Sequence, residues 1–255
     1  MPRLSRITLQ RTHTPEEISK RLKLGPQQTY LKDMVFGAID GSITTFAIVS
    51  GVAGAGLSSG VVIVLGLANL LADGFSMAAS NFLGTRADNA YRQAMKLREQ
   101  DEIEAYPEGE VEEIRQIFSS KGLTGKTLDD VVNTITSDPT LWVETMLHEE
   151  HGFSREPINP WSAALATFIA FLVAGFLPLA TFVMNWRFPG QVEAPFIWSA
   201  VLTLMCFGLV GAVKGLFTGS GYLLSVLETL LVGSVAAVLA YGVGYGLQSL
   251  VSGVY

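Results

Sequence analysis

Apolar residues are concentrated in five long runs, which cover about residues 34–54, 60–85, 161–184, 196–217 and 222–247. Each run contains about 20 residues or more, enough for a helix to cross about 30 Å of hydrocarbon. No segment shows the alternating pattern of a half-buried strand. The pattern therefore predicts an all-α integral membrane protein with five transmembrane helices.

Two polar segments lie outside these runs, and they divide the chain. One precedes the first run and is basic, and the other separates the second run from the third and is acidic. The expected parts are a basic N-terminal segment (1–32), transmembrane helices 1 and 2 (33–85), an acidic helical metal-binding segment (86–157) and transmembrane helices 3 to 5 (158–255).

Helix-capping residues place the helices of the polar segments. Thr14 has the features of an N-cap, with a proline directly after it. The second apolar run is expected to continue as a helix as far as Tyr106, because Pro107 then interrupts it and begins the next helix. Thr127 and Asp138 are the expected N-caps of two further helices.

The distribution of charge predicts the orientation in the membrane. The net charge is −6 and only 16% of residues are charged, yet seven of the 17 Lys and Arg residues lie in the first 32 positions. Basic residues also follow the second run, which places the N-terminus and the acidic segment in the cytoplasm. The chain has no compact basic domain, which argues against nucleic-acid binding. The single cysteine, Cys206, excludes an internal disulfide.

Two carboxylates lie within the apolar runs, Asp40 in the first and Asp73 in the second. A carboxylate at membrane depth costs at least about 2.5–3.5 kcal/mol, so it usually lines an interior pathway. Asn69, Asp73, Met77 and Asn81 are spaced by four residues and therefore share one helix face. Two carboxylates near a thioether indicate a path for a transition-metal cation.

Other features of the apolar runs allow more than one interpretation. Gly37 and Gly41 have the spacing that lets two helices approach closely. Met77 is either a packing residue or a ligand, and its alignment with Asp73 favours a ligand. Glu228 is either an anchor that reaches the membrane surface or the entrance of the pathway.

Acids dominate the segment from Glu99 to Glu150, which contains 14 acidic residues and three basic ones. Residues on one helix face could bind metal ions through oxygen atoms and one thioether: Glu99 with Glu102, Glu110 with Glu113, and Met146 with Glu150. Without a cation, so many carboxylates would repel one another. The alternative is a solvated helix face. His148 and His151 are more simply interpreted as surface histidines.

Three motifs resemble the vacuolar iron transporter family. They are Asp40-Gly-Ser-Ile-Thr-Thr-Phe-Ala47, Ala72-Asp-Gly-Phe-Ser-Met77 and Lys214-Gly-Leu-Phe-Thr-Gly219. The order of two spans, an acidic helical segment and three spans also resembles that family. The similarity extends from about Tyr30 to the C-terminus.

The resemblance implies a homodimer that exchanges ferrous iron for protons, with the pathway at the dimer interface and the acidic segment binding metal in the cytoplasm. Mn²⁺, Co²⁺ and Zn²⁺ are further candidate ions. The membrane would be the inner membrane of a prokaryote or the vacuolar membrane of a eukaryote.

The resemblance also implies roles for individual residues. The expected pathway residues are Asp40, Asp73, Met77, Asn69 and Thr44. The expected metal ligands of the acidic segment are Glu99, Glu102, Glu110, Glu113, Met146 and Glu150. Further candidate site residues are Glu149 in that segment and Glu228 in the fifth apolar run. Asn69 stands where plant members have a glutamate, so Asp73 is expected to take over its role. Leu147 replaces a second methionine.

The sequence features allow three functions. Proton-coupled transport explains the intramembrane acids, and the sequence contains no phosphate-binding G-x-x-x-x-G-K-[ST] loop of an ATP-driven pump. A membrane-anchored iron-binding protein or ferroxidase would be expected to contain Glu-x-x-His motifs, which the sequence lacks. A metal sensor without transport would not explain Asp40 and Asp73. Transport without enzymatic activity is therefore the leading prediction.

Overall fold

The computed structural model describes residues 10–24, 29–154, 156–218 and 221–252, and every regular element in these ranges is a helix. The helices are α2 (Pro15–Leu24), α3 (Leu31–Gly54), α4 (Ser59–Ala105), α5 (Pro107–Ser120), α6 (Gly125–Thr136), α7 (Pro139–Glu149), α8 (Pro160–Arg187), α9 (Pro195–Thr218), α10 (Tyr222–Gly246) and α11 (Gln248–Ser252). The all-α prediction is confirmed for this part of the chain.

The chain forms two compact units. The membrane unit comprises Met1–Asn81 and Trp161–Tyr255, and the acidic unit comprises Phe82–Pro160. Helix α4 contributes its first part to the membrane unit and the remainder to the acidic unit. Each unit is described separately below.

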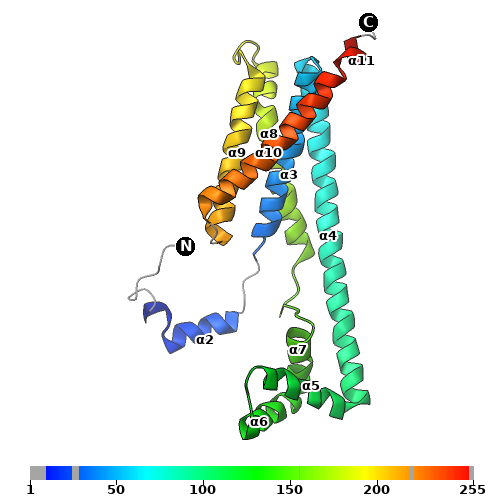
Figure 1. The fold of residues 1–255 in the computed structure, drawn as a ribbon, viewed down its shortest axis with the longest axis vertical. Helices are drawn as coiled ribbons and strands as arrows, with labels where there is room; N and C mark the ends of the chain where they lie inside the picture. The colour runs from blue at the N-terminus through cyan, green and yellow to red at the C-terminus, as the bar shows by residue number, and fades with distance from the viewer. Residues whose placement is uncertain (1–9, 25–28, 155, 219–220, 253–255) are drawn as a thin grey trace. The chain divides into compact units, whose positions relative to one another are not determined.

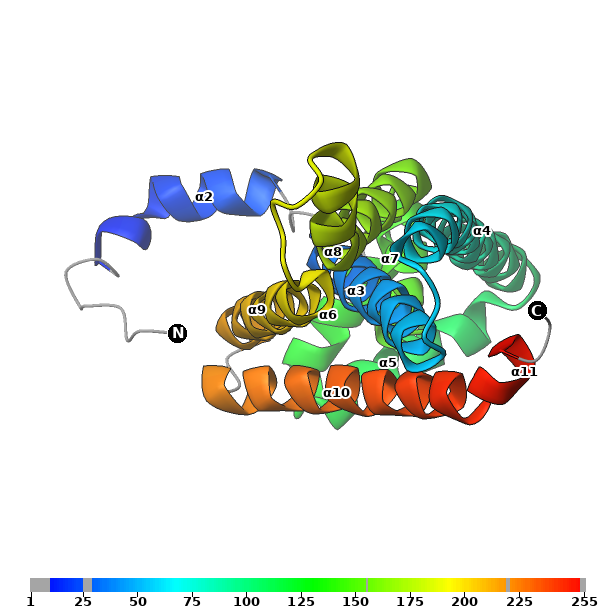
Figure 2. The same cartoon turned by 90° about the horizontal axis from the view of Figure 1, so that it is seen from above.

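Five helices of the described chain are long and apolar enough to cross a membrane: α3, α4, α8, α9 and α10. They coincide with the five predicted runs, so that prediction is confirmed. Seen from above, α3 lies in the middle of this unit (Figure 2), and it contacts both α9 and α10. Large apolar side chains such as Phe75 and Val238 are exposed on the outside. Such a surface suits a lipid environment.

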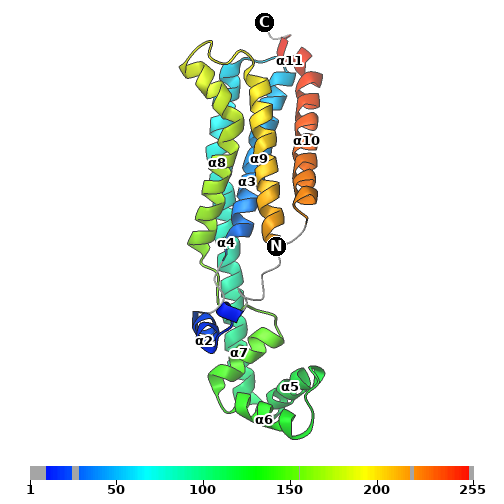
Figure 3. The ribbon, with the colours of Figure 1, turned by 90° about the vertical axis from the view of Figure 1, so that its left-hand side faces the viewer.

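Two glycines bring α3 and α8 close together, as their spacing predicted. A Cβ atom on Gly37 would collide with the carbonyl oxygen of Thr167, and one on Gly41 would collide with that of Phe171. The backbones of the two helices can therefore approach only because both positions lack a side chain. The helices of this unit lie side by side in Figure 3.

We expect Gly41→Ala to lower the stability of the protein in detergent by about 1–3 kcal/mol, the usual cost of overpacking. The added methyl group would lie 2.9 Å from the Cα atom of Phe171, and backbone cannot move aside cheaply. Gly208→Ala in α9 is the matched control, since no atom lies within 4 Å of its Cβ position. Thermal unfolding should separate the two variants, and equal melting temperatures would contradict the close packing.

The acidic unit consists of α5 to α7 with the end of α4 (Figure 1). Its small apolar core includes Ile114, Val132 and Trp142. Asp138 caps α7 as predicted, because its Oδ1 accepts hydrogen bonds from the backbone N–H groups of Thr140, at 2.9 Å, and Leu141. Thr14 likewise accepts a hydrogen bond from the N–H of the third residue after it. Both predicted caps are confirmed.

The prediction that Thr127 caps a helix was wrong. Helix α6 begins at Gly125, and its N-cap is Thr124, whose backbone is extended (φ −144°, ψ 160°). An N-cap requires this non-helical backbone, so Thr127 already lies in the first turn. Asp129 is consequently outside the first turn, and it forms an ion pair with Arg115 at 2.6 Å.

Candidate metal sites

The membrane unit contains an open pocket of about 540 Å³ between α3 and α4. It is lined by Lys32, Asp33, Phe36, Asp40, Ser76, Met77, Ser80 and Asn81. The pocket thus contains the carboxylate of Asp40 and the thioether of Met77, which were both predicted from the sequence as pathway residues. These two donors suit a borderline transition-metal ion better than a hard ion such as Ca²⁺.

The other predicted pathway residues do not line this pocket. Asp73 lies near Asp40, and the two carboxylates repel each other when both are charged. Thr44 donates its hydroxyl proton to the backbone carbonyl of Asp40 at 2.8 Å, within its own helix. Asn69 is half-buried on α4. Their part in ion movement remains a prediction.

Asp33 and Asn81 form a polar contact that the sequence analysis missed. Asn81 Nδ2 donates to Asp33 Oδ1 at 2.9 Å and to Thr167 Oγ1 at 2.7 Å, which ties α4 to both α3 and α8. Helical spacing could have identified Asp33, because Asp33 precedes Asp40 by about two helical turns and therefore lies on a similar face of the helix. The first span was expected to begin at residue 34, and the helix begins at Leu31.

Two carboxylates in the acidic unit are buried and incompletely satisfied. Glu99 is 2% exposed and Glu110 is 7% exposed. The Oε2 atom of each is buried and has no hydrogen-bond partner. A buried acceptor without a partner is costly, and nearby acids cannot donate to it when they are ionised. A bound cation would remove this cost.

The predicted acidic ligands lie around Glu110. The pKa of Glu110 is raised to about 7, chiefly by burial and then by the charges of Glu113, Glu99, Glu102 and Glu150, in that order of effect. Burial also raises the pKa of Glu150. All five acids therefore belong to one cluster, from α4, α5 and the end of α7. Such a cluster favours positive charge at its centre.

This pKa predicts how pH affects the metal-free protein. The carboxyl group of Glu110 is neutral in the folded state up to about pH 7, compared with a reference pKa of 4.5. Because the pKa is higher in the folded state, its contribution to stability is fully present below pH 4.5 and is lost as the pH rises to about 7. We expect a loss of about 1–3 kcal/mol between pH 4.5 and 7. Thermal unfolding with a chelator would measure it, and Glu110→Gln should remove that part of the pH dependence. An unchanged profile in the variant would refute this assignment.

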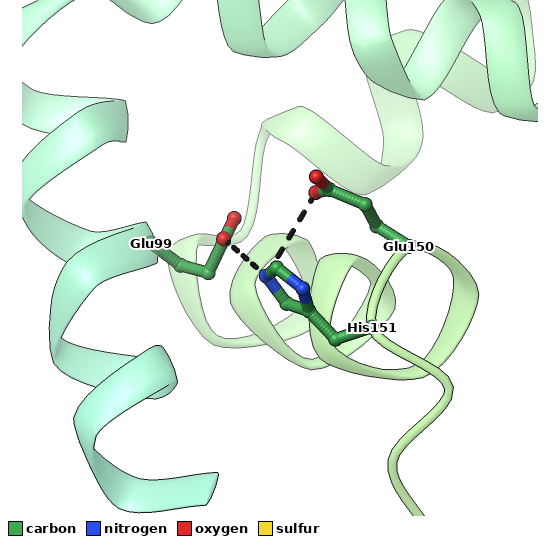
Figure 4. A group of neighbouring side chains, drawn as sticks. All are labelled: Glu99, Glu150 and His151. Atoms are coloured by element: carbon green, nitrogen blue, oxygen red, sulfur yellow. Dashed lines mark hydrogen bonds and ion pairs between the residues drawn. The ribbon is translucent and has the colours of Figure 1, made fainter. Parts of the chain in front are cut away.

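His151 joins the cluster (Figure 4) and is not a free surface residue, contrary to the favoured interpretation of the sequence. Its Nε2 lies 2.8 Å from Glu99 Oε1 and 4.0 Å from Glu150 Oε2. Glu99 comes from α4, whereas Glu150 and His151 follow α7. His148 points elsewhere, since its Nδ1 lies 3.0 Å from the carbonyl oxygen of Phe153.

The remaining candidates have partners of other kinds. Met146 is fully buried among the apolar residues of the acidic unit, so its thioether contributes to the core. Glu102 pairs with Arg98 at 3.0 Å. Glu149 pairs with Lys121, and this hydrogen bond lowers the pKa of Glu149. Glu228 pairs with Lys214 at 3.1 Å. Their role as ligands remains a prediction.

Known proteins are similar to this chain over most of its length. It is 32% identical over 221 residues to Vacuolar iron transporter 2 of Oryza sativa subsp. japonica, covering 86% of this chain and 88% of that protein. It is 32% identical over 213 residues to Vacuolar iron transporter 1 of Arabidopsis thaliana, covering 83% of each. With the Vacuolar iron transporter of Toxoplasma gondii it shares 34% identity over 228 residues, covering 87% of this chain and 76% of that protein.

A family model described as "VIT family" matches residues 31–245. The match covers all five apolar helices and the acidic unit. The resemblance seen in the sequence motifs is therefore confirmed, and the chain belongs to the VIT family, a family of transporters.

Proposed function

We propose that this protein is a secondary transporter that moves a divalent transition metal, ferrous iron in the first place, out of the cytoplasm in exchange for protons. The observation that carries the proposal is the pocket between α3 and α4, in which Asp40 and Met77 lie together within the apolar helices. The names of the similar proteins support iron as the ion.

The carboxylates supply a physical basis for proton coupling. A cation bound by Asp40 neutralises a charge that is costly at membrane depth, and a proton can neutralise the same charge when the cation leaves. Because a cation and a proton cannot neutralise the same carboxylate at once, metal and proton compete for Asp40. Competition of this kind couples the outward movement of one to the inward movement of the other.

The acidic unit is proposed to capture the metal on the cytoplasmic side. Its buried acids, Glu99 and Glu110, have unpartnered oxygen atoms that a cation would satisfy. The excess of basic residues near the N-terminus and after the second apolar run supports a cytoplasmic location. A homodimer with its pathway at the interface, and transport of Mn²⁺, Co²⁺ or Zn²⁺, complete the proposal.

Metal uptake into proteoliposomes under an imposed pH gradient tests this function. We expect Fe²⁺ to enter only when the gradient is present, and protons to move in the opposite direction. Binding of metal without uptake would support the alternative of an iron-binding protein or metal sensor. Oxidation of Fe²⁺ without uptake would support a ferroxidase. Either outcome would refute transport.

A further inference from the structure

We propose that His151 is a nitrogen ligand of the metal bound in the acidic unit, together with Glu99 and Glu150, and that it determines which ions are captured there. The inference deepens the proposed function, because it names a selectivity-determining residue of the capture site. It requires only that the acidic unit binds metal.

The geometry of the three side chains is close to that of a metal site. One ligand atom from each of Glu99, Glu150 and His151 lies within 4.8 Å of the other two. Bonds of about 2.0–2.2 Å to a metal ion place neighbouring ligand atoms about 3–3.5 Å apart. The separation of 2.8 Å between His151 and Glu99 is near this value, and Glu150 at 4.0 Å needs only a small side-chain rotation. Glu150 is 42% exposed, so it is free to rotate.

A purely structural histidine would leave part of the cluster unexplained. The hydrogen bond from His151 satisfies one oxygen of Glu99, whereas Oε2 of the same carboxylate is buried without a partner. Glu110, which is also buried, has a second such oxygen and interacts electrostatically with both Glu99 and Glu150. Glu99 Oε2 and Glu110 Oε2 could therefore bind a cation in addition to the three ligand atoms that already lie close together.

The local backbone and two aromatic rings hold the imidazole in place. Gly152 has a φ of +69°, the left-handed conformation common just past a helix end, and the N–H of Phe153 donates to the carbonyl oxygen of Leu147 at 2.9 Å. The ring of Phe153 lies 6.0 Å from that of His151 and 5.7 Å from that of Tyr91 on α4. Pre-positioned ligands of this kind lose little entropy when metal binds.

A nitrogen donor changes the preference of a site otherwise made of oxygen atoms. Carboxylates alone suit Mg²⁺, Ca²⁺ and Mn²⁺, whereas imidazole favours Fe²⁺, Co²⁺, Ni²⁺ and Zn²⁺. Cytoplasmic Mg²⁺ would compete strongly for a site composed only of acids. His151 would therefore favour Fe²⁺ and Co²⁺ over Mg²⁺ at the capture step, before any ion reaches the transmembrane helices.

The first test compares metal affinities of the purified full-length protein in detergent. We expect His151→Gln to weaken Co²⁺ binding by about 10–100-fold and Mn²⁺ binding by less than about threefold. Glutamine can still donate a hydrogen bond to Glu99. His148→Gln is the matched control, because His148 is three residues away, exposed and bonded to Phe153. Equal losses for both ions, or no loss for either, would overturn the proposal.

The second test detects the bond itself. The chain has three histidines, so a variant with His13→Gln and His148→Gln retains only His151. Pulsed EPR of Cu²⁺ bound to this variant should show the remote nitrogen of a coordinated imidazole, and the signal should vanish when His151→Gln is added. Absence of the signal from the single-histidine protein would refute the ligand assignment. Neither test measures transport, so failure of uptake in proteoliposomes would refute the proposed function alone.

Discussion

Replacing Asp40 by asparagine is expected to abolish metal transport while leaving the protein folded. Asp40 lies in the pocket between α3 and α4, about two turns inside the apolar part of α3. The other charged residues of α3, Lys32 and Asp33, precede this apolar part, so Asp40 is the only charged residue within it. An amide of the same shape preserves the packing, but it can neither neutralise a cation nor exchange a proton. A bound cation would lose its charged partner, so we expect uptake to fall by about 100-fold or more, equivalent to about 2.8 kcal/mol.

Uptake into proteoliposomes measures this effect, and thermal unfolding in detergent shows whether the variant is folded. Asp33→Asn is the matched control, because Asp33 lines the same pocket at the beginning of α3, where it accepts a hydrogen bond from Asn81. We expect a smaller loss in that variant, since Asp33 is near the end of the apolar segment. Wild-type uptake by Asp40→Asn would remove Asp40 from the pathway.

The five apolar helices could be predicted because their signal is local. A run of about 20 apolar residues is typical of a membrane-spanning helix. Pro107 marks a helix start through its fixed backbone angle, and Asp138 does so through its side-chain cap. The pair of Gly37 and Gly41 also predicted close packing correctly. Thr127 failed as a cap because Thr124 is an equally suitable residue three positions earlier, and sequence alone does not rank the two.

The contacts that complete the metal sites depend on the tertiary structure. Helical spacing predicts which acids share a face of one helix, but it does not reveal that His151 meets Glu99, which is 52 residues away in the sequence. That contact depends on how the end of α7 lies against α4, which helical spacing alone does not define. Asp33 was overlooked for a simpler reason, since a charged residue at the edge of an apolar run is usually assigned to the preceding loop.

Replacing Met77 by leucine is expected to change ion selectivity more than stability. Met77 lines the pocket with Asp40 and also packs against the apolar core of the membrane unit. Leucine has a similar volume, and such exchanges usually cost less than about 1.5 kcal/mol. The thioether, in contrast, has no substitute in leucine, and it interacts better with borderline ions than with hard ones.

We therefore expect uptake of Fe²⁺ and Co²⁺ by Met77→Leu to fall by about tenfold, equivalent to about 1.4 kcal/mol, while binding of metal by the acidic unit is unchanged. Met205→Leu in α9 is the control, because Met205 is exposed and lies outside the pocket. If Met77 only fills space, both variants should transport every ion at the wild-type rate. Competition between Fe²⁺, Co²⁺, Mn²⁺ and Mg²⁺ in proteoliposomes distinguishes these cases, since loss of a ligand lowers uptake of the borderline ions selectively, whereas a packing defect lowers uptake of all four alike.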